Sequence, residues 1–242
     1  MTQTILKSNE SNKTEFVNKM FTKIAAKYDL LNNLMTLGLH KKWKEDAIKL
    51  ALNENIIPRV ALDLCSGTGD LAITLHKYSP KTLITCIDNC KEMLNITNEK
   101  IKLLKINNVT LSLGDCEKLN YAPSSVDLLT IGFGLRNLVN KEECLNSFFK
   151  ILNNGGIFTC LDIAHPENLI WSTIYNLYFF KIIPILGQSF AKDKEAYTYL
   201  PNSLFSWYKQ NDFKELILKT GFKRCYYKNI LGGIAAIHIA VK

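Results

Sequence analysis

The chain has 242 residues and a formal net charge of +8 at pH 7; 47% of its residues are hydrophobic and 21% are charged. This length fits one large α/β domain, and its apolar share can build a core that needs neither metals nor disulfides. The basic balance is compatible with nucleic acid or an anionic membrane, but the lysines are scattered rather than blocked, which weakens the nucleic-acid interpretation.

Two helical stretches are expected before the first strand, near residues 14–35 and 40–52. They follow a polar segment at residues 1–12, which we expect to be flexible and which lacks the cationic start and apolar core of a secretory signal. We interpret residues 13–52 as a helical lid on a single domain that extends over residues 13–242.

Strand-like apolar runs then alternate with helical patterns along the chain. We expect strands at 59–64, 83–88, 109–115, 126–133 and 156–164. Helices are expected near 70–78, 90–105 and 141–152. Such an alternation predicts a parallel sheet with helices on both faces.

The end of the chain breaks this alternation. Strand-like runs at 224–231 and 234–241 are separated only by Gly232-Gly233, a link too short for a crossover, so these strands must be antiparallel neighbours. A helix-rich insertion is expected over about 168–220. Its apolar run at 170–187 is broken by polar residues and a proline, which favours a core helix over a bilayer span. A lid for an apolar ligand and a patch that touches a bilayer are the alternatives.

The first strand leads into a glycine turn of the kind that binds nucleotide cofactors. Asp63 is followed by Gly67 and Gly69, and a helical pattern begins directly after them. Glycines let the backbone approach a ligand, and a helix N-terminus offers unpaired N–H groups. Asp88 ends the second strand, where a carboxylate can accept hydrogen bonds from two ribose hydroxyls. These features predict a cofactor that contains a ribose.

The same glycine turn also fits the dinucleotide fingerprint, so NAD is the competing cofactor. Asp63 is unfavourable beside a pyrophosphate but can face the cationic amino-acid part of S-adenosylmethionine. Asp115-Cys116 follow the third strand, where an acid can bind the adenine amino group and a backbone N–H a ring nitrogen. A seven-stranded sheet with an antiparallel last strand resembles the Rossmann-like class I S-adenosylmethionine-dependent methyltransferases. We therefore expect that α/β fold and that cofactor.

The fourth strand ends in T-I-G-F-G-L-R-N at residues 130–137. Ligands of doubly wound sheets bind outside the carboxyl ends of the strands, and Arg136-Asn137 lie just past such an end. A buried guanidinium there can stabilise an oxyanion. From the residues alone, a surface arginine that caps the next helix is the alternative.

Five stretches of the chain resemble the menaquinone/ubiquinone C-methyltransferase family, and the resemblance covers roughly residues 14–242. They are residues 17–44, D-L-C-S-G-T-G-D-L at 63–71, G-L-R-N at 134–137, Y-T-Y-L-P-N-S at 197–203 and G-G-I-A-A-I-H at 232–238. The glycine turn is shared by many methyltransferases, whereas the first and third stretches are more specific. The resemblance implies C-methylation of a prenylated quinol ring.

The resemblance also implies roles for individual residues. Together with the motif above, it gives a cofactor set of Asp63, Gly67, Thr68, Gly69, Asp88, Asp115 and Cys116. Arg136 is expected at the acceptor, with Tyr28 and Asn137 as further substrate contacts. His165 and Tyr199 are candidates for orienting the ring or moving a proton, and a packing role is the alternative for each.

Two departures from many family members bear on the substrate. Gly132 stands where a serine often lines the cofactor site, and L-D-I-A-H-P at 161–166 replaces an E-F-S-x-P type segment. Both resemble the versions from cyanobacteria and plastids, which methylate 2-phytyl-1,4-naphthoquinone in phylloquinone synthesis. A naphthoquinone is therefore favoured over a benzoquinone, with a bacterial cytoplasm or a plastid stroma as the compartment. The acceptor must be the reduced quinol, because a quinone ring carbon is too electron-poor to attack a methyl sulfonium.

The seven cysteines are an odd number without Cys-x-x-Cys spacing, so we interpret them as reduced thiols. Cys86 and Cys90 lack a second ligand pair at zinc spacing, and we predict no metal site. The expected partners are a lipid-soluble quinol and a membrane surface, without nucleic acid, and a homodimer is compatible with the sequence. An RNA or DNA methyltransferase is the main alternative, although its N/D-P-P-Y/F type of pattern is not found after the fourth strand. A non-catalytic subunit with a cofactor fold is the third.

Overall fold

The computed structural model describes residues 10–167, 171–173 and 207–242. Its strands are β1 (Val60–Leu64), β2 (Leu83–Asp88), β3 (Val109–Leu113), β4 (Val126–Gly132), β5 (Leu152–Ile163), β6 (Arg224–Ile230) and β7 (Ala235–Val241). Its α-helices are α2 (Glu10–Ile24), α3 (Tyr28–Thr36), α4 (Leu39–Leu52), α5 (Asp70–Tyr78), α6 (Lys91–Leu103), α7 (Lys141–Ile151) and α11 (Gln210–Lys219). Short 3-10 turns are η1 (Ala25–Lys27), η2 (Leu135–Asn137) and η4 (Leu231–Gly233).

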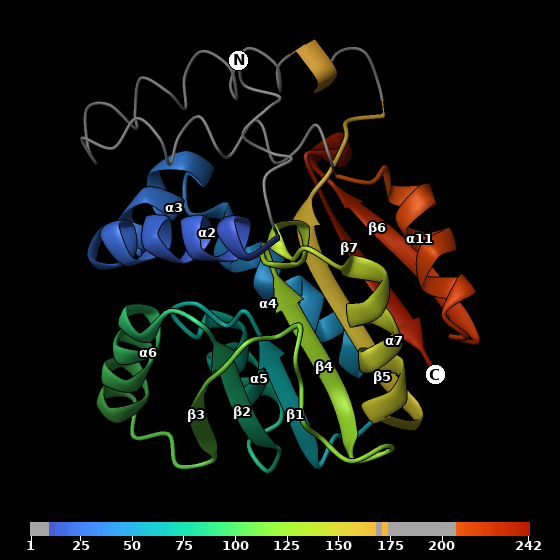
Figure 1. The fold of residues 1–242 in the computed structure, drawn as a ribbon, viewed down its shortest axis with the longest axis horizontal. Helices are drawn as coiled ribbons and strands as arrows, with labels where there is room; N and C mark the ends of the chain where they lie inside the picture. Colours follow the sequence, from blue (N-terminus) through green and yellow to red (C-terminus); the bar gives the residue numbers. More distant parts are fainter. Residues whose placement is uncertain (1–9, 168–170, 174–206) are drawn as a thin grey trace.

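The strands form one seven-stranded sheet in the order β3-β2-β1-β4-β5-β7-β6 (Figure 1). Strands β1 to β5 pair in parallel, while β7 is antiparallel to both β5 and β6. The expected α/β fold with a reversed last strand is confirmed. The short glycine link between β6 and β7 forces the reversal, as the sequence predicts.

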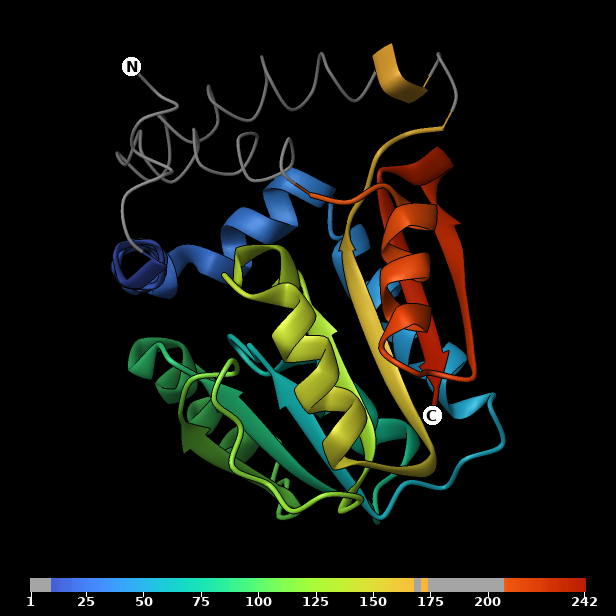
Figure 2. The same cartoon turned by 45° about the vertical axis from the view of Figure 1, so that its right-hand side comes forward.

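Apolar side chains alternate between the two faces of the sheet. In β1, Ala61 packs into the core under α4, α5 and α6, whereas Leu62 and Leu64 pack into the core under α7 and α11. Figure 2 shows α7 and α11 together on one face. Because both faces are covered, the central strands read as nearly continuous apolar runs.

The N-terminal helices α2 and α3 cross the molecule above the carboxyl ends of the central strands (Figure 1). The bounds of these helices differ from the expected ones. Helix α2 begins at Glu10 rather than near residue 14. The stretch expected as one helix at 14–35 is broken at η1, where the backbone tightens before α3 begins.

The remaining differences lie near irregular backbone. Strand β5 starts at Leu152 rather than 156, because it runs through a bulge: Val126 pairs with Leu152, but Leu128 pairs with Ile157. Of the insertion expected at 168–220, the described part holds α11 and residues 171–173. In the described part of the chain, no helix is long and apolar enough to cross a bilayer.

Candidate active site

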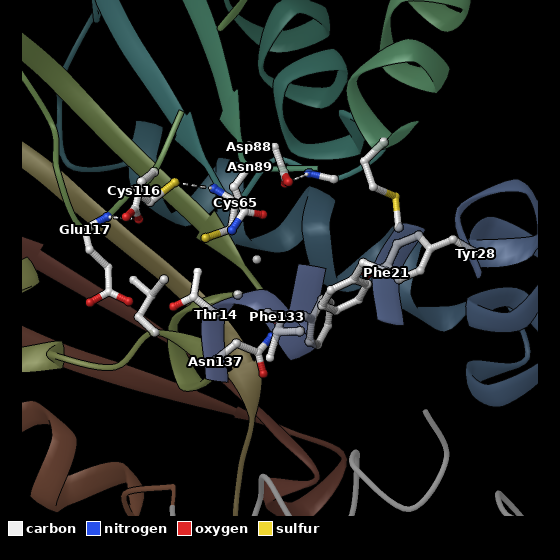
Figure 3. A pocket seen from close by; sticks show the side chains of 17 residues that line it. Thr14, Phe21, Tyr28, Cys65, Asp88, Asn89, Cys116, Glu117, Phe133 and Asn137 are labelled. Atoms are coloured by element: carbon white, nitrogen blue, oxygen red, sulfur yellow. Dashed lines mark hydrogen bonds between the residues drawn. The ribbon is translucent and has the colours of Figure 1, made fainter. Parts of the chain in front are cut away.

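A cavity of about 690 Å³, including its opening to solvent, lies between the carboxyl ends of the strands and helix α2 (Figure 3). The described residues that line it are Thr14, Val17, Phe21, Tyr28, Cys65, Gly67, Asp88, Asn89, Met93, Asp115, Cys116, Glu117, Gly132, Phe133, Gly134, Asn137 and Leu138. The cavity therefore joins the ends of β1, β2, β3 and β4 with the N-terminal helices, which is where a doubly wound sheet places its ligand.

The glycine turn after β1 is held by a threonine that the sequence motif does not show. Thr97 donates from Oγ1 to the Gly67 carbonyl at 2.8 Å. A Cβ added at Gly69 would lie 2.4 Å from Thr97 Cγ2, and Gly69 has φ +77. Gly67 also has φ +55, but a Cβ added there would meet nothing within 4 Å, and Gly67 lines the cavity. Gly69 thus serves packing, while Gly67 leaves backbone open to the cavity.

Asp88 stands on the cavity wall at the end of β2. Its Oδ2 accepts a hydrogen bond from the Gly67 N–H and its Oδ1 one from the Cys90 N–H, both at 2.8 Å. Burial raises the pKa of Asp88, although these two N–H groups oppose the shift. An ionised carboxylate offers about four acceptor sites. Asp88 is therefore fixed in orientation and still has acceptor positions for ligand hydroxyls.

The loop after β3 forms another wall of the cavity. Asp115 accepts at Oδ1 from the Glu117 N–H at 2.9 Å, and the Cys65 N–H donates to Cys116 Sγ at 3.1 Å (Figure 3). The contact with Cys116 and burial raise the pKa of the Cys65 thiol well above its usual value, so Cys65 stays protonated at neutral pH. This wall supplies a carboxylate from Asp115 and the sulfur atoms of Cys65 and Cys116.

Two residues expected to touch the cofactor are turned away from the cavity. Asp63 is 1% exposed, and its carboxylate accepts from Thr130 Oγ1 at 2.8 Å and from the Ala72 N–H at 3.2 Å. Burial raises the pKa of Asp63 to about 7. Thr68 donates to Asp29 Oδ1 at 2.7 Å instead. Both side chains hold the frame of the site, because buried polar groups at a strand end must find partners.

Thr68 belongs to a charged network that joins the helices around the glycine turn. Lys100 of α6 contacts Asp29 of α3 and Asp70 of α5, each at 2.7 Å. Lys44 of α4 also contacts Asp70 at 2.7 Å. Burial opposes ionisation of Asp70, but the ammonium groups of Lys44 and Lys100 hold its pKa well below its usual value. The sequence analysis missed this network, because its members are 26 or more positions apart from their partners.

Arg136 is buried just past the end of β4, as expected, but it is paired with a carboxylate of the neighbouring strand. Its guanidinium Nη1 donates to Asp162 Oδ1 at 2.6 Å and to the Phe133 carbonyl, and its backbone N–H points to Asp162 Oδ2 at 3.3 Å. Arg136 is 6% exposed and is not among the described residues that line the cavity. Strands β4 and β5 are neighbours, so the end of β5 brings a carboxylate beside the turn, and a buried cation pairs with it.

Asn137 and Tyr28, expected to contact the substrate, both line the cavity. Asn137 directs its Nδ2 towards the Phe133 carbonyl at 3.5 Å. The Tyr28 ring packs edge-on against Phe21 with 5.9 Å between centroids. Figure 3 shows Phe21 and Tyr28 on the side of the cavity opposite Glu117. The aromatic pair gives this side an apolar wall.

The expected proton-handling residues find no support in the described geometry. His165 Nε2 lies 3.0 Å from the Trp207 carbonyl, and its backbone N–H lies 3.4 Å from Gln210 Oε1. His165 therefore ties the end of β5 to the start of α11 and does not line the cavity. Tyr199 lies outside the described residues.

Two cations stand at the edge of the cavity. Lys13 and Lys141 both donate to the carbonyl of Leu138, at 3.3 Å and 2.9 Å. Burial and the charge of Lys141 lower the pKa of Lys13 to about 8, and burial also lowers the pKa of Lys141. Glu117 is near but accepts from the Val139 and Asn140 N–H groups. Lys13 and Lys141 therefore place positive charge beside Leu138, which lines the cavity, although neither lysine is itself among the described lining residues.

Comparisons with known proteins agree with this architecture. The model of the ubiE/COQ5 methyltransferase family matches residues 7–242. The chain is 34% identical to the demethylmenaquinone methyltransferase of Porphyromonas gingivalis, with 96% of this chain and 95% of that protein covered. It is 37% identical to the ubiquinone/menaquinone biosynthesis C-methyltransferase UbiE of Rickettsia prowazekii, with 98% and 96% covered.

Solved structures show the same fold at low sequence identity. A SAM-dependent methyltransferase from Aquifex aeolicus superposes with a TM-score of 0.56 at 17% identity, over 80% of this chain and 88% of the other. The YcgJ protein of Bacillus subtilis gives 0.57 at 13% identity, over 81% and 98%. Fold, glycine turn and near full-length similarity lead to one conclusion: the chain belongs to the ubiE/COQ5 methyltransferase family and is an S-adenosylmethionine-dependent C-methyltransferase.

Proposed function

We propose that this enzyme methylates a ring carbon of a prenylated quinol, with a naphthoquinol as the preferred ring. The observation that carries the proposal is the cavity itself. It places the Asp88 and Gly67 wall opposite an apolar and amide wall made by Phe21, Tyr28 and Asn137. One wall suits a ribosyl cofactor and the other a flat aromatic acceptor. The relatives above are named for menaquinone and ubiquinone biosynthesis.

The residues present fit S-adenosylmethionine. Asp88 would accept hydrogen bonds from the ribose hydroxyls, and the open backbone at Gly67 would give the amino-acid part room to approach. Asp115 and Cys116 form the wall that would hold the adenine. When bound, this cofactor would supply an electrophilic methyl sulfonium.

The acceptor carbon becomes nucleophilic when the adjacent quinol hydroxyl ionises. A positive charge nearby lowers the pKa of that hydroxyl and stabilises the anion. Lys13 and Lys141 at the cavity edge provide this charge in our proposal, because Arg136 is already engaged by Asp162. Asn137 donates a hydrogen bond that orients the ring.

Arg136 keeps an indirect part in this proposal as a positioning residue. Its guanidinium fixes the Phe133 carbonyl and thereby the turn that carries Phe133, Gly134 and Asn137 into the cavity wall. A Cβ at Gly134 would lie 2.5 Å from Cys65 Cβ, so the turn packs directly on the end of β1. The Arg136–Asp162 pair therefore sets the shape of the acceptor side.

The preference for a naphthoquinol rests on sequence likeness. Gly132 lines the cavity, and a Cβ there would lie 2.7 Å from Leu71 Cδ1. Leu71 packs in the core and is not among the described residues that line the cavity, so glycine at this position serves the packing of β4 against α5. A phytyl or polyprenyl tail completes the substrate. A benzoquinol is the alternative acceptor.

The test is methyl transfer from labelled S-adenosylmethionine to a prenylated demethylnaphthoquinone, with and without dithionite, beside a matched benzoquinone. We expect label in the naphthoquinone lipid only under reduction. Faster labelling of the benzoquinol would overturn the preferred ring. Equal labelling without dithionite would overturn the quinol mechanism. Label found only in added RNA would replace the proposal by a nucleic-acid methyltransferase.

A further inference from the structure

Three leucines of α3 and of the turn into α4 are exposed. Leu30 is 54% exposed, Leu37 is 87% exposed and Leu39 is 42% exposed. Leu30 lies in the first turn of α3, and Leu37 follows the last residue of that helix. Leu39 opens α4 directly after the turn. We call Leu30, Leu37 and Leu39 the leucine tip.

Leu37 has a backbone conformation that is unfavourable for leucine. Leu37 ends α3 with φ 50, in the left-handed region where glycine or asparagine is the favourable choice. The left-handed conformation is unfavourable for leucine, because its Cβ comes too close to the following carbonyl oxygen. The turn is fixed by the Gly38 N–H, which donates to the Asn33 carbonyl at 3.0 Å. A strained and almost fully exposed leucine in a fixed turn gains nothing in the isolated protein, which points to a function at a surface.

The charge beside the leucine tip selects that surface. Lys41 and Lys42 are exposed on the first turn of α4, and residues 37–42 contain no acid. Lys42 pairs with Asp46 at 2.7 Å, and the chain as a whole carries +8. Exposed apolar side chains followed by two exposed lysines match an anionic bilayer, where leucines enter the acyl boundary and lysines meet the headgroups.

We propose that the leucine tip inserts into the surface of an anionic phospholipid bilayer. The same helix α3 begins with Tyr28, which lines the cavity, so insertion brings the apolar side of the site to the membrane. A lipid-soluble acceptor would then enter without crossing water. Bilayer binding by the tip stands on its own, and only this route of entry rests on the proposed function.

The test compares the full-length wild type with Leu37→Ser in flotation with phosphatidylcholine vesicles that contain or lack phosphatidylglycerol. Ile57→Ser is the matched control, because Ile57 is 88% exposed and lies past the other end of α4. We expect Leu37→Ser to lower the partition coefficient about tenfold, because the substitution removes apolar surface that the bilayer would bury. Ile57→Ser should match the wild type. Circular dichroism and cofactor binding confirm that each variant is folded.

Lys41→Gln separates the headgroup contribution, and we expect it to lower binding about fivefold, only on vesicles with phosphatidylglycerol. Equal partitioning of Leu37→Ser and Ile57→Ser would overturn the proposal, as would a wild type that does not bind. A loss of self-association in Leu37→Ser without a change in vesicle binding would assign the tip to a second copy of the chain instead. Turnover of a short-chain, water-soluble quinol should be unaffected by Leu37→Ser. Failure of that assay in the wild type would count against the proposed function and not against bilayer binding.

Discussion

At the scale of single residues, the candidate site separates groups that face the cavity from groups that support it. Asp88 and Gly67 face the cavity, while Asp63 and Gly69 lie behind it, although all four belong to one motif. The sequence pattern does not distinguish them, because it records only that an acid or a glycine is present. The packing of Thr97 against Gly69 distinguishes the two glycines.

The two glycines should respond differently to the same substitution. Gly69→Ala places a Cβ against Thr97 and forces a left-handed alanine, so we expect a loss of unfolding free energy of about 2 kcal/mol or more. Gly67→Ala meets open space and should cost only about 1 kcal/mol in stability while weakening cofactor binding at least tenfold. Urea unfolding and calorimetric titration measure the two effects. An equal stability loss in both variants would contradict the assignment.

Asp63 predicts a pH dependence of stability in the cofactor-free protein. Its folded pKa of about 7 lies above the ordinary aspartate value of 3.8, so the folded state binds an extra proton between these two pH values. The contribution of Asp63 to stability is therefore complete below about pH 4 and is lost as the pH rises through about 7. Urea midpoints of the wild type minus those of Asp63→Asn should fall across this range. A difference that is flat or rises with pH would show that the carboxyl is ionised when folded.

At the scale of secondary-structure elements, two ionic contacts connect segments that are distant in the chain. Lys100 joins α6 to α3 and α5, and Arg136 joins η2 to β5 through Asp162. The first contact fixes the N-terminal helices over the glycine turn. The second fixes the turn on the acceptor side. Each ionic contact therefore stabilises one wall of the cavity and also holds the side chains of that wall in place.

Lys100→Met should loosen the N-terminal helices. The substitution removes two partly buried ion pairs and leaves Asp29 without its lysine, so we expect local opening of α2 and α3 to become about tenfold more frequent. Hydrogen exchange of residues 13–36 measures it. Lys102→Met is the control, because Lys102 is 66% exposed and contacts Glu99 only at 3.7 Å. Identical hydrogen-exchange rates in both variants would contradict the prediction that the Lys100 ion pairs hold α2 and α3 in place.

Arg136 can be tested through its partner. Arg136→Met leaves Asp162 buried without a cation, which should cost about 3–5 kcal/mol of unfolding free energy. Combining it with Asp162→Leu should restore most of that loss. If Arg136 positions the turn, turnover also recovers in part in the double variant. If turnover stays at the level of the single variant while stability returns, the guanidinium acts on the acceptor itself.

At the scale of the whole molecule, the sheet order brings four strand ends to one edge and the N-terminal helices close over them. The cavity therefore exists only in the assembled fold, and its ligand should stabilise the entire domain. S-adenosylmethionine at 100 times its dissociation constant contributes about 2.7 kcal/mol. For a domain of this size we expect the melting temperature to rise by about 5–10 °C. NAD at the same concentration should leave it unchanged, and an equal shift with NAD would contradict the cofactor assignment.

The sequence by itself determined the fold class, the antiparallel end of the sheet and the family. These features depend on local signals: strand and helix periodicity, the glycine turn and the link at Gly232-Gly233. Local signals can be recognised without the tertiary structure. It also placed Asp88, Asp115, Asn137 and Tyr28 near the site, because strand ends and motif positions are local as well.

Only the tertiary structure decided which of these groups face the cavity. Arg136 turned to Asp162 and Thr68 to Asp29, since a buried polar group pairs with whatever acceptor the fold brings beside it, 26 and 39 positions away in these two cases. The leucine tip was recognised only from the exposed fractions of its side chains, which cannot be read from the residue types. Distance and burial are properties of the folded chain, and they decide what each side chain can touch.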